Sequence, residues 1–137
     1  MLLTSLDIDS VMYRVLANSG INDVLSGRVY RGEQRPVNSS LEDIVVNTIA
    51  ITTSSCPQTA TSNVNIYVPD MDVNVDGVVT NMPNIGRLSE ITNLVLNILR
   101  NAIVEGLEFT PANHIVIAEP TMRQHYSNIR VNWNIQK

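Results

Sequence analysis

The residues best suited to metal chemistry form the run Asp72-Val73-Asn74-Val75-Asp76-Gly77. Carboxylate or amide oxygens at the first, third and fifth positions, followed by glycine, match the opening of a calcium-binding loop. The closing position of such a loop needs a bidentate glutamate, and here it is occupied by Pro83. The favoured interpretation is a tight Asp-Gly turn that joins two short valine-containing strands. The sequence therefore predicts no metal site, and a calcium site over residues 72–80 stays the alternative.

Cys56 and the two histidines are the other side chains with catalytic or ligating chemistry. A single cysteine cannot form an intrachain disulfide or a thiolate metal site, and no basic neighbour in the sequence activates Cys56. His114 and His125 are not spaced from each other or from carboxylates as metal ligands are. No Ser-His-Asp triad or carboxylate pair can be identified. We therefore predict no catalytic residue and no cofactor, and we expect that the protein is not an enzyme.

The overall composition limits the kinds of partner that the chain can have. It has 137 residues, of which 44% are hydrophobic and 16% charged, and a net charge of −4. This length predicts a single domain over residues 1–137, and the apolar content excludes simple disorder. A net negative chain has no electrostatic reason to bind nucleic acid, so we expect no sequence-specific nucleic-acid partner. No apolar run approaches the about 18 residues that span a membrane, so no membrane partner is expected.

The basic residues are almost all arginines. Eight of the nine are arginine, and the only lysine is Lys137. Arginine is enriched and lysine depleted at protein interfaces, so this bias favours a surface covered by other subunits. Codon or lineage bias is the alternative. Arg28, Arg31 and Arg35 form a small basic cluster, which either contacts a carboxylate on a neighbouring subunit or lies in a solvated loop.

Two helices are predicted from apolar residues that recur at spacings of three and four. The first starts at an Asp7 or Asp9 cap and ends before Gly20. The second spans residues 86–105, with Gly106 as its C-terminal cap. The first apolar stripe comprises Ile8, Val11, Met12, Val15 and Leu16. The second comprises Leu88, Ile91, Val95, Ile98, Leu99 and Ala102.

The strands that must accompany these helices follow from alternation and from β-branched runs. We expect a short strand over 28–31 and longer strands over 44–53, 63–68, 114–118 and 126–136. The segments between them, 35–40, 53–63, 70–84 and 110–112, are predicted loops or turns. In the last strand Ile129, Val131, Trp133 and Ile135 alternate with polar residues, so Trp133 is expected in the core. The predicted fold class is α+β, a mostly antiparallel β-sheet with two α-helices packed on one face.

Two stretches in the first half of the chain carry a family resemblance. They are Ser26-Gly27-Arg28-Val29-Tyr30-Arg31-Gly32-Glu33-Gln34-Arg35-Pro36 and Glu42-Asp43-Ile44-Val45-Val46-Asn47. With the order of elements that follows, they resemble the tail-completion and tail-terminator proteins of tailed phages, which act near the head–tail joining region. The strand Asn63-Val64-Asn65-Ile66-Tyr67-Val68-Pro69 is similar to versions from phages or prophages of gut Bacteroidetes. The segment 70–84 departs from the family by being long and acidic.

The resemblance implies a structural role in the virion. Copies of the chain would assemble into a ring, a hexamer, that ends the tail tube or joins it to the neck. The partners would be further copies of itself and tail-tube, neck or connector proteins, and assembly would take place in the bacterial host cytoplasm. A small ligand-binding or calcium-binding α+β domain is the alternative.

A closed ring brings two different surfaces of neighbouring subunits together. We expect complementary charges on these surfaces. The predicted subunit-interface residues are Arg28, Arg31 and Arg35 on one copy, facing Asp70, Asp72 and Asp76 on the next.

Overall fold

The computed structural model describes residues 2–53 and 57–136, so Cys56 and Lys137, and the predictions that concern them, lie outside the described residues. The elements in chain order are α1 (Ser5–Ala17), η1 (Ile21–Asp23), β1 (Val29–Arg31), β2 (Asp43–Ile51), β3 (Gln58–Pro69), β4 (Met71–Val75), β5 (Val78–Met82), α2 (Ile85–Asn101), β6 (Leu107–Glu119), η2 (Pro120–Met122) and β7 (Gln124–Ile135).

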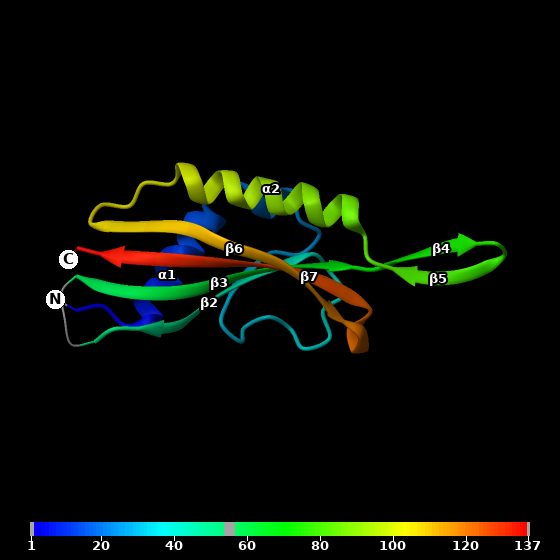
Figure 1. Ribbon diagram of the computed structural model, residues 1–137, viewed down its shortest axis with the longest axis horizontal. Helices are drawn as coiled ribbons and strands as arrows, with labels where there is room; N and C mark the ends of the chain where they lie inside the picture. Colours follow the sequence, from blue (N-terminus) through cyan, green and yellow to red (C-terminus); the bar gives the residue numbers. More distant parts are fainter. Residues whose placement is uncertain (1, 54–56, 137) are drawn as a thin grey trace.

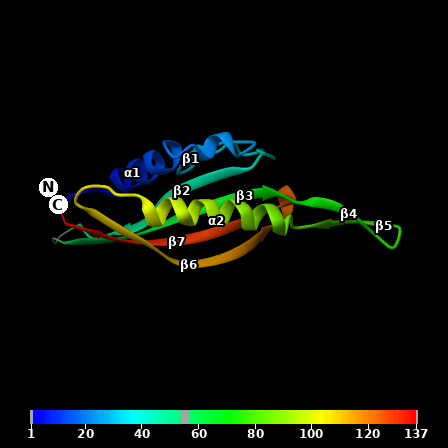
Figure 2. The same ribbon diagram turned by 90° about the horizontal axis from the view of Figure 1, so that it is seen from above.

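Five of the strands form one sheet in the order β1-β2-β3-β7-β6 (Figure 1). The β1–β2 pair is parallel and the other three pairs are antiparallel. Helix α1 contacts β1 and β2, and helix α2 contacts β3, β6 and β7 (Figure 2). Side chains from both helices and from the sheet meet in one buried cluster, so the two helices cover the same face. The α+β fold and the mostly antiparallel sheet are confirmed.

The core lies between this sheet face and the helices. Alternate residues of β3 and β7 point into it because successive side chains of a strand face opposite sides. The buried strand residues include Val64, Ile66, Val68, Ile129, Val131, Trp133 and Ile135. The helices add Ile8, Met12, Leu16, Leu88, Ile91, Val95 and Leu99. Trp133 lies in the core as expected, and its Nε1 donates to Ser62 Oγ at 3.0 Å.

Helix α1 begins one turn earlier than a cap at Asp7 or Asp9 would allow. Its N-cap is Thr4, whose hydroxyl accepts from the Asp7 amide, while the Asp7 carboxylate accepts from the Thr4 amide at 2.8 Å. This reciprocal arrangement is a capping box. Asp7 is thus a partner of the cap and not the cap itself. Gly20 takes the expected left-handed conformation, with φ of 89°.

Helix α2 ends at Asn101, before the predicted boundary at 105. Ala102 is already extended, and the chain then turns so that Val104 bridges Leu107. Gly106, with φ of 77°, serves this turn into β6 and does not cap the helix. On the buried side of the helix Leu99 is 1% exposed, whereas Ile98 is only half-buried. Neither α-helix in the described part of the chain is long and apolar enough to cross a membrane.

Two strands extend through segments predicted as loops or turns. Strand β3 begins at Gln58 instead of residue 63, because residues 58–62 pair with β7 and residues 60–62 also pair with β2. Gln58 is buried, and its side chain bonds to the backbone of Leu3. Strand β6 runs through Pro111, where a turn was expected, with a bulge between Pro111 and Asn113. A proline is tolerated there because β6 is an edge strand, whose outer side needs no ladder donor.

Candidate functional site

The segment 70–84 forms a projecting β-hairpin and not a ligand-wrapping loop. Strands β4 and β5 are paired along their whole length, from Met71 opposite Met82 to Val75 opposite Val78. Asp76 and Gly77 make the two-residue turn between them. Both turn residues have positive φ, 51° and 82°, as a type I′ turn requires. The predicted Asp-Gly turn is therefore confirmed. We call residues 71–82 the hairpin arm; it extends past the end of the sheet that lies opposite the two chain termini (Figure 1).

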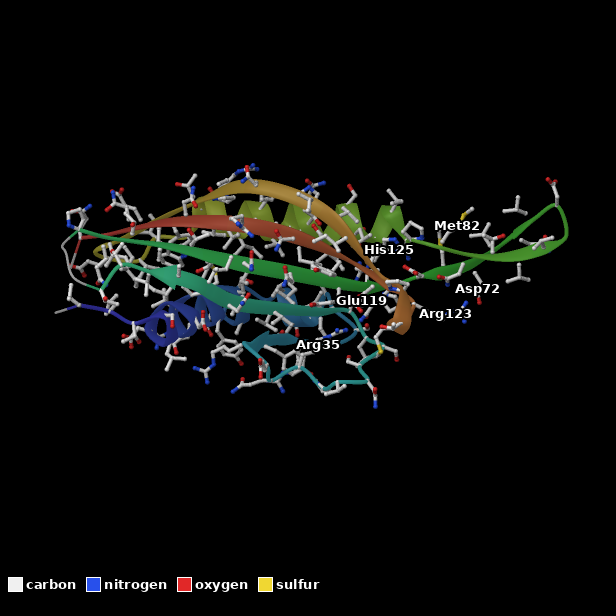
Figure 3. All side chains as sticks on the ribbon, turned by 60° about the horizontal axis from the view of Figure 1, so that its bottom comes forward. Arg35, Asp72, Met82, Glu119, Arg123 and His125 are labelled. Atoms are coloured by element: carbon white, nitrogen blue, oxygen red, sulfur yellow. The ribbon has the colours of Figure 1, made fainter. Side chains whose placement is uncertain are left out.

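The hairpin arm has one apolar face that the described residues leave largely in solvent. Because the side-chain period of a strand is two, the paired residues divide between two faces. The apolar face comprises Met71, Val73, Val75, Val78, Thr80 and Met82. The other face comprises Asp72, Asn74, Val79 and Asn81. Val78 is 64% exposed and Val75 43% exposed. Met82 and Asp72 point to opposite sides of the arm in Figure 3.

Polar contacts at its base fix the arm to the body. The Asp70 amide donates to the Arg123 carbonyl at 2.9 Å. The Asp70 carboxylate also lies 2.6 Å from His125 Nδ1, and the Arg123 guanidinium lies 2.9 Å from the Asp72 carboxylate. Arg123 itself has positive φ, 50°, in the turn between η2 and β7. These contacts orient the arm, so its apolar face is presented in a defined direction.

A second exposed apolar surface lies along β6, at the edge of the five-stranded sheet. The outer side of β6 pairs with no strand in the part of the chain that the structure describes. Ile115 and Val116 on this edge are 53% and 46% exposed. Between α2 and β6 runs a groove of about 300 Å³, lined by Ile85, Leu88, Ser89, Thr92, Asn93, Leu96, His114 and Val116. Helix α2 therefore covers the edge strand only in part.

The sheet face away from the helices is mainly polar and uncharged, with Glu108 and Arg130 as charged residues on it. It carries a group of asparagines, which are Asn47, Asn63, Asn65, Asn113, Asn128, Asn132 and Asn134. Asn128 Nδ2 donates across the strands to Asn63 Oδ1 at 3.1 Å and to Asn65 Oδ1 at 2.6 Å. We call this surface the asparagine face.

The three predicted interface arginines do not form one cluster. Arg35 is held inside its own chain by Asp43, as described below. The Arg31 guanidinium donates to Ser10 Oγ at 2.9 Å and lies 5.3 Å from the Tyr13 ring centre, on α1. Arg28 lies 5.8 Å from the centre of the Tyr30 ring. Arg31 and Arg35 thus serve the fold of their own subunit.

The predicted acidic residues are also largely engaged within the chain. Asp70 pairs with His125 and Asp72 with Arg123, as described above. Asp76, at the tip of the arm, is exposed. The predicted charge pairing between copies stays a prediction, but substitutions at Arg35 cannot test it. They would disturb the internal structure of the loop 32–42.

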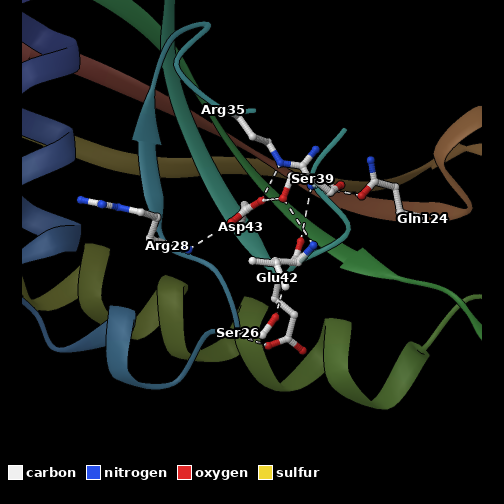
Figure 4. Close-up of polar contacts among 8 residues, drawn as sticks. Ser26, Arg28, Arg35, Ser39, Glu42, Asp43 and Gln124 are labelled. Atoms are coloured by element: carbon white, nitrogen blue, oxygen red, sulfur yellow. Dashed lines mark hydrogen bonds and ion pairs between the residues drawn. The ribbon is translucent and has the colours of Figure 1, made fainter. Parts of the chain in front are cut away.

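Asp43 is a buried carboxylate at the centre of a polar network that ties this loop to the sheet (Figure 4). Its side chain is fully buried, and Arg35 Nε donates to it at 2.8 Å. The Arg28 amide donates at 3.0 Å, and the Ser39 hydroxyl also donates. Arg35 in turn donates to Gln124 at 3.1 Å and stacks 4.0 Å from the centre of the Tyr67 ring.

This network explains the glycine that precedes Arg28. A Cβ atom at Gly27 would lie 1.8 Å from Asp43 Oδ1 and 2.5 Å from the Glu42 carbonyl oxygen. The backbone can approach the buried carboxylate closely only because residue 27 has no side chain. The Gly-Arg-Val-Tyr motif is therefore required by packing around Asp43.

Glu42 and Arg87 form a second ion pair, between the residue that precedes β2 and helix α2. The Arg87 guanidinium donates to both Glu42 oxygens, at 2.6 and 2.8 Å, and also contacts Glu90. The hydrogen bond from Arg87 holds the pKa of Glu42 below its ordinary value of 4.5. Because the folded state prefers ionised Glu42, this pair stabilises the fold above that ordinary pKa. The stabilisation is lost as the pH falls through the lowered pKa.

We therefore expect Glu42→Gln to lower the free energy of unfolding near neutral pH, and we expect the difference from the parent to shrink in acid. Urea unfolding between acid and neutral pH measures the free energy of unfolding of the parent and of Glu42→Gln. Glu33→Gln, which changes an exposed carboxylate in the loop 32–42, is the control and should show little difference at any pH. If Glu42→Gln lowered the free energy of unfolding equally at every pH, the ionised Glu42 carboxylate would not be the source of the stabilisation.

The histidines occupy structural positions. His114 Nε2 lies 2.6 Å from Ser127 Oγ, and Thr92 Oγ1 donates to the same Ser127 oxygen at 2.8 Å. Ser127 is fully buried, so its hydroxyl is inaccessible to a substrate. Among the described residues no three His, Cys, Asp or Glu side chains converge as a metal site. The arrangement joins α2 to the sheet.

Sequence reasoning placed the hairpin turn but missed the apolar face of the arm and the buried role of Asp43. The alternation of Met71, Val73 and Val75 with polar residues was the available signal for an amphipathic strand. No signal in the sequence marked Asp43, because its partners come from distant segments.

No protein-family model and no curated protein matches this chain.

Proposed function

We propose that the protein is a structural subunit that assembles with copies of itself into a ring at the tail end or head–tail neck of a tailed phage. The observation that carries this proposal is the hairpin arm, an oriented extension whose apolar face is largely exposed in the part of the chain that the structure describes. Exposed apolar surface of this kind is typical of protein interaction sites. A two-stranded hairpin is also only marginally stable in water without further packing.

The element order supports the phage assignment. A helix, a short strand, two long strands, a long helix and two closing strands follow one another, as the resemblance implies, with the hairpin arm between the second long strand and the long helix. The asparagine face offers a broad surface of hydrogen-bonding groups with little charge. Such a face suits contact with tail-tube or neck proteins without strong dependence on salt.

Light scattering on the size-fractionated protein tests the assembly. We expect a mass that is a whole multiple of the 15.2 kDa chain, above a dimer, and annular particles by electron microscopy. Val78→Asp should abolish the assembly and leave the subunit folded, because Val78 is 64% exposed. Asn74→Asp places the same charge on the other face of the arm and is the matched control. A parent chain that stays monomeric at all accessible concentrations would contradict the proposal.

A further inference from the structure

We propose that the hairpin arm of one copy binds as an additional strand to the free edge of β6 in the next copy, with β5 against residues 113–118. This inference rests on the proposed self-association and names the two surfaces that produce it. The binding chemistry is β-augmentation, in which backbone hydrogen bonds give affinity and alternate side chains give specificity.

The arm has what a donated strand needs. In the described residues β4 and β5 pair only with each other, so each strand keeps one free row of backbone donors and acceptors. Met71, Val75, Val78 and Met82 of the apolar face are exposed and Val73 and Thr80 are half-buried. The contacts at Asp70 and Asp72 hold the arm away from the body. The donor strand is thus already extended and oriented before it binds.

The edge of β6 has what an acceptor needs. Residues 113–118 read Asn-His-Ile-Val-Ile-Ala and contain no Asp, Glu, Lys or Arg. Free edges of natural sheets are normally protected by charges, by proline or by bulges. Here Pro111 and the bulge lie before this stretch, and the first charge after it is Glu119. The edge is therefore open to a further strand along this uncharged stretch.

The side-chain pattern of the arm fits this edge in one orientation. With its apolar face toward α2, Val78 and Thr80 lie beside His114 and Val116, over the groove lined by Leu88 and Leu96. The other arm face then continues the asparagine face with Asp72, Asn74 and Asn81. Val79 is the one apolar residue of that second face. It comes opposite Ile115, which is exposed on the asparagine face of β6.

The acceptor must belong to a second copy. The arm leaves the body next to the Glu119 end of β6, since Pro69, Gln124 and Glu119 are register neighbours. From there it points away from the sheet, whereas its own β6 edge runs back toward the chain termini (Figure 1). Donor and acceptor are different surfaces of one chain, so each copy binds the next one. Such a heterologous contact closes into a ring when the rotation allows it.

Disulfide cross-linking between two differently marked copies tests the inference. One copy carries Val79→Cys and a longer affinity tag, the other carries Ile115→Cys, and both carry Cys56→Ser so that no other cysteine is present. Both substituted side chains are more than half exposed, so the fold should tolerate the changes. Directly opposed strand residues lie about 4.5–5.5 Å apart between Cα atoms, within reach of a disulfide. After coexpression and mild oxidation we expect the mixed covalent dimer to exceed either self-dimer several-fold.

The matched control replaces Ile115→Cys by Thr110→Cys, which is exposed on the same face of the same strand but outside the proposed contact. It should give little mixed dimer. An assembled protein without the mixed dimer, or with the Val79→Cys self-dimer dominant, overturns this inference and leaves self-association standing. Equal cross-linking by Thr110→Cys also overturns it. A parent chain that is monomeric by light scattering overturns both proposals.

Discussion

Replacing Asp43 by alanine is expected to lower the free energy of unfolding by about 3–5 kcal/mol, because it leaves a largely buried arginine without its partner. Asp43 is fully buried, and the Arg35 side chain is only 13% exposed. The substitution also removes the acceptor for the Arg28 amide and the Ser39 hydroxyl. Equilibrium unfolding in urea measures the loss. Amide hydrogen exchange at Arg28 should accelerate in parallel, since its hydrogen bond is removed.

Two variants separate this mechanism from a general effect of removing a carboxylate. Glu33→Ala removes an exposed carboxylate from the same loop and should change stability by no more than about 0.5 kcal/mol. Asp43→Asn keeps the size of the side chain and an acceptor oxygen, and it should cost less than Asp43→Ala. Equal losses for Asp43→Ala and Glu33→Ala would show that the buried pair does not stabilise the fold.

Replacing Leu99 by alanine is expected to cost about 2–5 kcal/mol, because it opens a cavity in a fully packed region. Leu99 is 1% exposed and lies on the face of α2 that meets the sheet. Ile98→Ala should cost clearly less, because Ile98 is half-buried at the side of the helix. Asn97→Ala is the neighbouring exposed control and should change little.

The same unfolding measurements on these three consecutive residues determine the rotational position of α2. The order of losses should be Leu99, then Ile98, then Asn97. A larger loss at Ile98 than at Leu99 would place a different side of the helix on the sheet, and it would also alter the groove beside β6.

Local patterns were enough to predict the parts of the fold that depend on neighbours in the chain. The apolar stripe from Leu88 to Leu99 specified α2, since residues three and four apart share one helix face. The alternation from Ile129 to Ile135 specified the two faces of β7. The Asp76-Gly77 pair specified the hairpin turn, because both residues accept the positive φ that a type I′ turn needs.

Element boundaries were less predictable where pairing partners decide them. Residues 58–62 read as a polar loop, yet they form a strand because β7 pairs with all of them and β2 pairs with residues 60–62 on the other side. Pro111 indicated a turn, yet β6 continues through it because β7 pairs with β6 on both sides of this residue and the outer edge needs no ladder donor. In both cases the backbone hydrogen bonds available from distant strands outweigh the local preference of the residues.

The sequence by itself thus determined the fold class, the long helix, the alternating strands and the Asp-Gly turn, all of which follow from local periodicity. Only the tertiary structure decided that Arg35 reaches Asp43 and Gln124 instead of a neighbouring subunit, because Gln124 lies 89 residues further along the chain. It likewise decided that, among the described residues, the apolar face of the arm stays largely exposed and β6 ends the sheet. Alternation shows that a strand has an apolar face, but whether anything covers that face depends on where the whole chain places it.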